Sequence, residues 1–265
     1  MMTTYQLLSQ FWDERSPVWS IILFATVIYT FVAVTHSASR RQIAFFVLSA
    51  IAFALALASP LALLATRYSF GAHMAQHLLL LLLVPLFAIL AWPSSGSPSE
   101  DGLSDAPQRR MIVPGWLAGV AAMWFWHIPA LCTAAMQHSS VFAIQTISLV
   151  AAGAAFWWPI FRPQLQRRMQ PQAAAVYLFS GCVGCSLLGI YVTFSPSPVC
   201  PLYEVGGGSP ALMHLVHQQW GLTHRVDQQI GGLLMWVPAC MIYLTAILQR
   251  FASWYQVPQG RLASE

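Results

Sequence analysis

The sequence has no lysine and very little charge of either sign. Only 8% of its 265 residues are charged, and its basic residues are twelve arginines. A soluble domain normally carries about 25% charged residues, so water alone is not the expected solvent of this chain. The net charge of +4 is spread along the sequence and gives no reason to expect a nucleic-acid partner. Because 57% of the residues are hydrophobic, we predict an all-α, multi-pass membrane protein that contacts lipid.

Signatures of the common enzyme classes are also missing. The glycine run in "EVGGGSP" does not follow a predicted strand, which argues against a phosphate-binding loop. No nucleophile–base arrangement and no pair of catalytic carboxylates stands out. We therefore predict that the protein is not an enzyme.

The long apolar runs predict a single membrane domain over residues 1–265. A spanning helix needs about 20 mostly apolar residues. The stretch 93–112, rich in serine, proline, glycine and acid, is predicted to be a linker loop, and 195–227 a second long loop. Seven segments qualify as spans: 17–36, 43–65, 73–92, 113–130, 141–161, 173–194 and 228–249.

The arginines predict the orientation of this bundle. With seven spans the two termini lie on opposite sides, and three arginines then fall on the N-terminal side against nine on the other. Loops rich in positive charge stay in the cytoplasm. We therefore predict that the N-terminus and the loop 195–227 lie outside, and that the C-terminus and the linker 93–112 are cytoplasmic. The N-terminal "MMTTYQLLSQFWDERSP" lacks the features of a cleaved signal, so the first span is expected to be retained.

Four ionisable residues are predicted to reach the same depth near the outer face. His73 and His77 begin the third span, His127 ends the fourth and Asp227 begins the seventh. Residues spaced i, i+4 share one helix face, with Cβ atoms about 5–6 Å apart, so His73 and His77 could bind one metal ion together. Topology predicts the shared depth of all four residues, whereas their proximity in the membrane plane is a hypothesis.

The residue types at this depth favour copper. Imidazole suits copper and zinc, and thioether sulfur selects Cu(I). Met123 lies one turn deeper than His127, and Met235 two turns deeper than Asp227, although methionine is also common packing material in membranes. Asp227 could be a ligand, an acceptor that fixes a histidine tautomer, or the cap of its own helix. His127 alone could simply hydrogen-bond at the interface, but ionisable groups within spans are functional candidates by default.

Weaker signals come from the other histidines and from the cysteines. His214 and His217, spaced i, i+3 in the outer loop, could capture metal transiently or could be solvated loop residues. The pair in "GCVGC" near the middle of the sixth span could bind Cu(I) or take part in redox chemistry, or could serve close helix packing. An oxidising compartment could pair two outer cysteines, but nothing in the sequence shows that they meet. The two pairs are Cys182 with Cys185, and Cys132 with Cys200.

Three motifs together resemble one protein family. "HMAQHLLLLLLVPLFAIL", "WHIPALCTAAMQHSSVFAIQTISLVAAGAAFWWPI" and "DQQIGGLLMWVPA", in this order and at similar spacing, are similar to the CtaG-type cytochrome c oxidase assembly factors of bacteria. The resemblance implies a multi-pass protein of the bacterial inner membrane that helps to mature a haem–copper oxidase, with an oxidase subunit as partner. Copper delivery to the CuB centre is the role usually proposed for the family.

The resemblance places this chain's four polar residues on the family's motif positions: His73, His77, His127 and Asp227. One departure stands out in the fifth span. Gln145 and Thr146 occupy the place where the family commonly has a Glu-His pair. This member could therefore lack one polar partner or ligand that its relatives have.

We therefore expect an assembly factor that binds copper at the outer side, near a water-accessible helix mouth, and passes it on. Two alternatives stay open. A membrane redox protein with haem b or quinone would use histidines from facing helices, but His73 and His77 share one helix and cannot ligate opposite faces of one haem. A copper transporter would need polar or sulfur-containing residues along the whole path across the bilayer. In this sequence only Met123, Met235 and the Cys182/Cys185 pair could provide them.

Overall fold

The computed structural model describes residues 3–6, 11–93, 106–163, 168–205 and 208–255. Within these ranges the regular structure is helical, and six helices are long and apolar enough to cross a membrane. The count becomes seven if one helix pair, bent by 78°, is taken as a single span. The prediction of an all-α, multi-pass membrane bundle is thus confirmed. The orientation of the bundle relative to the cytoplasm stays a prediction.

Short helices join the long spans. Among the described residues one π-helical segment, η1, interrupts the central span, and another, η3, follows the short helix α12. In chain order the elements are α2 (Pro17–Thr35), α3 (Arg40–Leu57), α4 (Pro60–Arg67), α5 (Phe70–Leu78), η1 (Leu79–Leu83), α6 (Val84–Ala91), α7 (Ala106–Phe125), α8 (Pro129–Gln137), α9 (Ser139–Phe161), α10 (Pro171–Phe194), α11 (Leu202–Val205), α12 (Pro210–His214), η3 (Leu215–Gln219) and α13 (His224–Tyr255).

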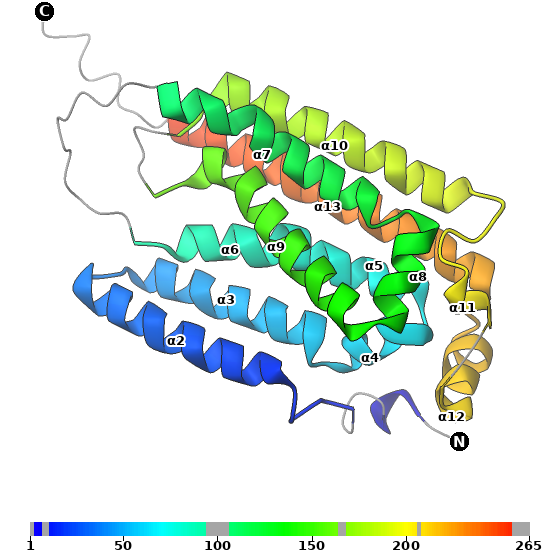
Figure 1. The fold of residues 1–265 in the computed structure, drawn as a ribbon. Helices are drawn as coiled ribbons and strands as arrows, with labels where there is room; N and C mark the ends of the chain where they lie inside the picture. The colour runs from blue at the N-terminus through cyan, green and yellow to red at the C-terminus, as the bar shows by residue number, and fades with distance from the viewer. Residues whose placement is uncertain (1–2, 7–10, 94–105, 164–167, 206–207, 256–265) are drawn as a thin grey trace, which may run out of the picture.

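The continuous span formed by α5, η1 and α6 is the central helix of the bundle. Figure 1 shows α2 and α3 on one side of it and α7, α10 and α13 on the other, with α9 crossing between. Within the most apolar stretch of this central span 61% is buried inside the protein, against 11% for the corresponding stretch of α2. Large side chains on α2, such as Phe24 and Phe31, are exposed and suit contact with lipid. Polar residues on α5 are therefore surrounded by protein.

Two predicted spans are wrong over their last residues, and proline is the reason in both. The segment 43–65 breaks after Leu57, because Pro60 starts a new helix, α4, which Ser59 caps. The segment 113–130 breaks after Phe125. Proline disfavours the helical conformation of the residue before it, and Ile128 is extended (φ −65°, ψ 125°) ahead of Pro129. Helix α8 then leaves the direction of α7 at 78°.

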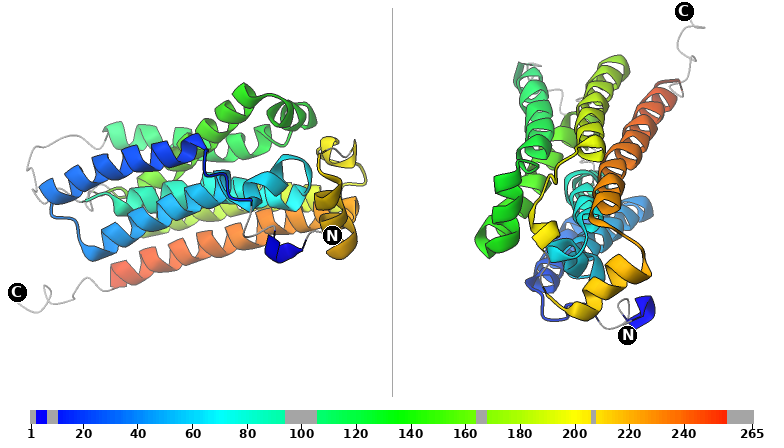
Figure 2. Two further views of the ribbon diagram at one scale, coloured as in Figure 1. Left: turned by 90° about the horizontal axis from the view of Figure 1, so that it is seen from below. Right: turned by 90° about the vertical axis from the view of Figure 1, so that its right-hand side faces the viewer.

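Both predicted loops contain more regular structure than expected. Helix α7 begins at Ala106, so the last part of the linker 93–112 is helical, while 94–105 lies outside the described residues. The stretch 195–227 is not a simple loop, because it forms α11, α12, η3 and the first turn of α13. The short helices α4, α8, α11 and α12 gather at one end of the bundle (Figures 1 and 2).

The central span contains a π-helical segment, η1, directly before Pro85. Proline lacks an N–H and clashes with the carbonyl four residues earlier, so the regular α-helical ladder is interrupted here. Neighbouring helices supply partners for nearby carbonyl groups. The Trp157 indole donates to the Leu82 oxygen at 3.1 Å, and the Ser49 hydroxyl donates to the Val84 oxygen at 2.9 Å. Such partners are required within a bilayer, where no water can replace them.

A disulfide ties together the end that carries the short helices. Cys132 on α8 is bonded to Cys200, which precedes α11, with their Cα atoms 6.0 Å apart. The pairing that the sequence left open therefore occurs. Structural disulfides persist in oxidising compartments. The bond thus supports, independently of the arginines, an outer location for this end.

The disulfide predicts a specific count of reactive thiols. Protein unfolded without reductant should take up alkylating reagent at Cys182, Cys185 and Cys240, which are free in the structure. After reduction all five cysteines should react. A Cys132→Ser variant should show four reactive thiols without reductant, because Cys200 is then released. Intact-mass spectrometry makes the measurement, and five reactive thiols in the unreduced parent would contradict the pairing.

Candidate metal centre

The start of α5 is held by a carboxylate from another helix. Asp227, in the first turn of α13, accepts hydrogen bonds from the Phe70 N–H at 2.6 Å, the Gly71 N–H at 3.0 Å and the Ser69 hydroxyl at 2.7 Å. The Ser69 oxygen in turn accepts from the Ala72 N–H at 3.1 Å. The first three N–H groups of α5 thus have partners. Asp227 is a helix cap, as one reading of the sequence allowed, but it caps α5 and not its own helix.

Two glycines let α5 and α13 approach closely enough for this contact. A Cβ atom on Gly71 would stand 3.0 Å from the Asp227 carboxylate. A Cβ atom on Gly231 would stand 2.6 Å from the Phe70 ring and 3.0 Å from the Met74 side chain. Any larger residue at Gly231 would push the helices apart. The glycines therefore help to place the carboxylate at the N-terminus of α5, where negative charge is favoured by the helix dipole.

His73 and His77 lie side by side in the interior. Their ring centres are 4.3 Å apart, and the residues are 0% and 5% exposed. All four ring nitrogens lack a hydrogen-bond partner in the structure. The expectation that they stand at a water-accessible helix mouth is therefore wrong. The stretch expected to be an open loop forms short helices instead, and these cover the start of α5.

Tyr203 of α11 is part of that cover. Its ring centre lies 6.2 Å from that of His73 and meets Phe70 edge-on at 5.8 Å. Its hydroxyl donates a hydrogen bond to the carbonyl of Ala65 in α4. Burial, and secondarily the nearby Asp227 carboxylate, raise the pKa of Tyr203 well above its ordinary value. The phenol therefore stays neutral and keeps its proton for this hydrogen bond.

His127 lies in the turn between α7 and α8 and faces the same region. Its ring centre is 5.4 Å from that of His77. Its Nδ1 stands 2.5 Å from the Met123 carbonyl and must donate to it, so Nε2 of the neutral ring carries a lone pair. That Nε2 lies 3.2 Å from the Met74 sulfur, which has no hydrogen to offer. Two electron-pair donors therefore face each other, as the ligands of a cation do.

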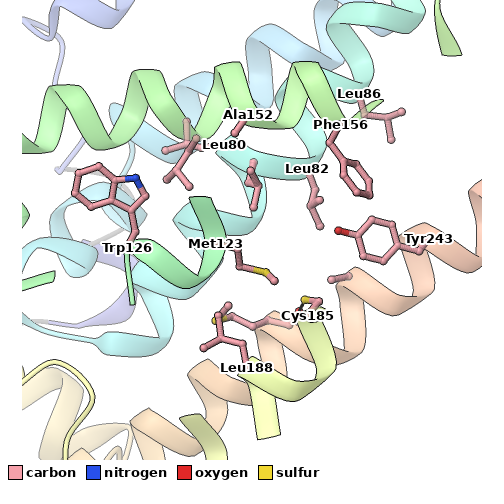
Figure 3. Packing of buried hydrophobic residues seen from close by; sticks show 14 of the residues in the cluster. Leu80, Leu82, Leu86, Met123, Trp126, Ala152, Phe156, Cys185, Leu188 and Tyr243 are labelled. Atoms are coloured by element: carbon pink, nitrogen blue, oxygen red, sulfur yellow. Dashed lines mark hydrogen bonds between the residues drawn. The ribbon is translucent and has the colours of Figure 1, made fainter. Parts of the chain in front are cut away.

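Met74 is the site residue that the sequence reading missed. A signal was present, because Met74 and His77 are spaced i, i+3 and such residues share a helix face. The two methionines that were named from the sequence lie slightly deeper. Met123 and Met235 line one small cavity together with His77, His127 and the thiol of Cys185. Figure 3 shows Met123, Cys185 and Tyr243 pointing toward this common space.

Gln145, where the resemblance led us to expect a Glu, belongs to this region as well. Its side chain is 1% exposed and lies beside His77, but its Nε2 makes no hydrogen bond of acceptable geometry. The amide adds no charge to the site. Among the described residues, no three His, Cys, Asp or Glu side chains stand close enough to hold one ion as placed. The arrangement is thus one of imidazoles with thioether neighbours, a donor set that suits Cu(I).

The structure gives His217 a neighbour that the predicted pair with His214 did not include. The ring beside His217 is that of His224, at 4.7 Å between centres. His217 lies in η3, where the wider π-helical turn alters the face on which successive residues stand. The i, i+3 spacing of an α-helix therefore does not by itself place His214 and His217 on one face here, and their pairing stays a prediction.

Asp227 predicts a stability effect that is independent of any metal. Asp227→Asn removes the charge that is attracted to the α5 dipole and turns an NH₂ group toward backbone N–H donors. We expect a loss of about 2–3 kcal/mol, visible as a lower midpoint of thermal unfolding in detergent. Asp13→Asn, at an exposed acid, should change stability by less than about 0.5 kcal/mol. Equal midpoints for the two variants would contradict the role of Asp227.

Comparison with known proteins identifies the family. The sequence model of the family described as cytochrome c oxidase caa3 assembly factor (Caa3_CtaG) matches residues 22–257. The match covers most of the chain, so the chain belongs to this family, and the resemblance found in its motifs is confirmed. No curated protein and no solved structure shows significant similarity to it.

Proposed function

We propose that this member of the caa3 assembly factor family holds Cu(I) between the imidazoles of His73, His77 and His127 and the thioether of Met74. It then passes the ion to a subunit of a cytochrome c oxidase, at the CuB centre. The family description supports a role in oxidase assembly, with an oxidase as partner and without catalysis by this chain. Copper is cargo in this proposal.

The contact between His127 Nε2 and the Met74 sulfur, at 3.2 Å, carries the proposal. With the His127 ring neutral and its Nδ1 proton donated to the Met123 carbonyl, neither atom has a hydrogen for the other. Close to it lie the four ring nitrogens of His73 and His77, buried and without partners. Buried polar atoms nearly always have a partner, and each orphan costs about 1–3 kcal/mol. A cation at this place would satisfy nitrogen lone pairs on all three rings.

The spacing of the rings supports one ion shared among them. A metal–nitrogen bond of about 2.0–2.1 Å puts the ring centre roughly 3 Å from the ion, so two rings bound at about 90–110° have centres roughly 4.5–5 Å apart. His73 and His77 stand at 4.3 Å, and His77 and His127 at 5.4 Å. These separations lie on either side of that range. Binding is thus expected to draw the His127 ring toward His77 by a small side-chain rotation.

The Cys132–Cys200 disulfide and the arginine distribution both support an outer location for this site. In a bacterium this side of the inner membrane faces the periplasm, from which copper would be received. Asp227 acts in this proposal as a positioning residue. Its carboxylate fixes the start of α5, and the first turns of α5 carry His73 and His77.

The alternatives named from the sequence are less well supported. For haem b, the His127 nitrogen that would ligate iron is already in contact with Met74. For a transporter, the sulfur atoms of Met123, Met235 and Cys185 do extend below the imidazoles. The next cavity inward, however, has an almost wholly apolar lining, with Met123 and Tyr243 among leucine, glycine, valine and phenylalanine. The donors therefore favour a holding site over a continuous path.

The proposal predicts which side chains retain copper. Purified protein loaded with Cu(I) should keep the ion, and His73→Ala/His77→Ala should lose it. Met74→Leu preserves volume but removes the sulfur, so it should weaken binding and remove the sulfur signal from the copper X-ray absorption spectrum. Met241→Leu, at a methionine that is 59% exposed on α13, is the matched control and should behave like the parent.

Two outcomes would contradict the proposal. One is equal copper content in the parent and in a folded double-histidine variant, with folding checked by the unfolding midpoint. The other is a normal copper content of the oxidase in cells that carry only that variant. Mass spectrometry of the metal content serves both measurements.

A further inference from the structure

We infer that His217 and His224 form a second metal site at the outer end, open to solvent on the His224 side, which captures Cu(I) before it reaches the buried imidazoles. The site itself is argued from its own geometry. Only the onward destination of the ion rests on the proposed function.

The two rings are placed as a pair of ligands. Their centres are 4.7 Å apart and their planes are tilted by 49°. This separation falls within the range of roughly 4.5–5 Å expected for two imidazoles on one ion. His224 is exposed, so water and ions reach the pair from its side, whereas the Nε2 atom of the half-buried His217 is itself shielded from solvent. The rings come from η3 and from the first residue of α13, which the chain brings together through the turn between them.

The hydrogen bonding of His217 leaves one nitrogen available. Its Nδ1 lies 2.6 Å from the Leu222 carbonyl oxygen and must donate to it, so Nε2 of the neutral ring holds a lone pair. That Nε2 has no partner in the structure. Metal-binding histidines commonly donate their second N–H to a carbonyl in this way. His127 shows the same arrangement with the Met123 carbonyl, so in both sites a carbonyl group accepts from Nδ1 and leaves Nε2 for a metal ion.

The charges around the pair predict weak, exchangeable binding. Imidazole suits copper and zinc, and water would complete the coordination, as in an open zinc site. Arg225, exposed and next in sequence to His224, opposes a bound cation. A site of this kind releases its ion readily, which suits capture better than storage.

One cavity is shared by the rim and the cover of the buried site. Its lining includes His224 and Arg225 from the rim together with Asp227, Tyr203 and Phe70 from the cover. Tyr203 and Phe70 in turn lie against the ring of His73. An ion released by His224 therefore stands next to the residues that separate it from the buried imidazoles.

The test is a titration of the full-length protein in detergent with Cu(II), used as a paramagnetic probe of the same two imidazoles, followed by electron paramagnetic resonance of the imidazole nitrogens. Two ligands on one protein act as a chelate, so His224→Asn should weaken Cu(II) binding by roughly 100-fold and remove one nitrogen coupling. His214→Asn is the matched control, because it removes a histidine from the same segment, and it should leave both quantities unchanged. The inference is overturned if the two variants behave alike.

A second measurement separates this site from the buried one. His224→Asn should reach the same final Cu(I) content as the parent but load more slowly at low copper, whereas His73→Ala/His77→Ala should retain the Cu(II) signal. Loss of Cu(I) capacity in folded His224→Asn protein would mean that the sites are not distinct and would overturn the inference. If the double variant keeps its Cu(I) while the His224 effect stands, the proposed function fails and the rim site remains.

Discussion

The contact between the Asp227 carboxylate and the N-terminus of α5 is the constraint on which the candidate site depends. An acid in the first turn of one helix supplies acceptors for the first two N–H groups of another. The dipoles of α5 and α13 therefore both favour this one buried negative charge. Because His73 follows at the end of that first turn and His77 one turn later, the direction of their rings is set by this cap. Met235, on the same helix as the acid, is brought to the cavity beneath them.

The histidine site was predictable to the extent that it depends on spacing along single helices. The i, i+4 pair and the shared depth of His127 follow from local sequence and topology. Met74 and Tyr203 were missed because their roles arise from contacts between elements, which depend on Gly231 and on the fold of the outer segment. Pro60 and Pro129 were local signals for the two helix breaks. They were overlooked because the apolar runs that contain them are long enough to predict continuous spans. The break before Pro129 is what removes His127 from its helix and lets its Nδ1 meet a backbone carbonyl.

The charge of the site is as informative as its donors. In the proposed site His73, His77 and His127 would act as neutral ligands, and Gln145 contributes an amide where the resemblance led us to expect a carboxylate. The oxygens of Asp227 are already engaged with backbone N–H groups. A monovalent ion held only by neutral donors keeps its full charge in a poorly polarisable interior, where charge is costly. Such a site has a lower affinity for the ion than a site that contains an acid. The lower affinity suits an ion that must be released to another protein.

The Cys132–Cys200 bond links the completion of this structure to the compartment in which it folds. It closes a loop of 68 residues, and crosslinks of this length stabilise the folded state by about 4 kcal/mol in the chain-entropy account. One cysteine follows the turn that holds His127, and the other precedes the helix that places Tyr203 over His73. With this end outside, as we propose, the two halves of the cover are joined only after both have crossed the membrane and met an oxidant. A chain inserted in the opposite direction would then keep these thiols in a reducing environment, and the disulfide that joins the two parts over the proposed copper ligands would not form.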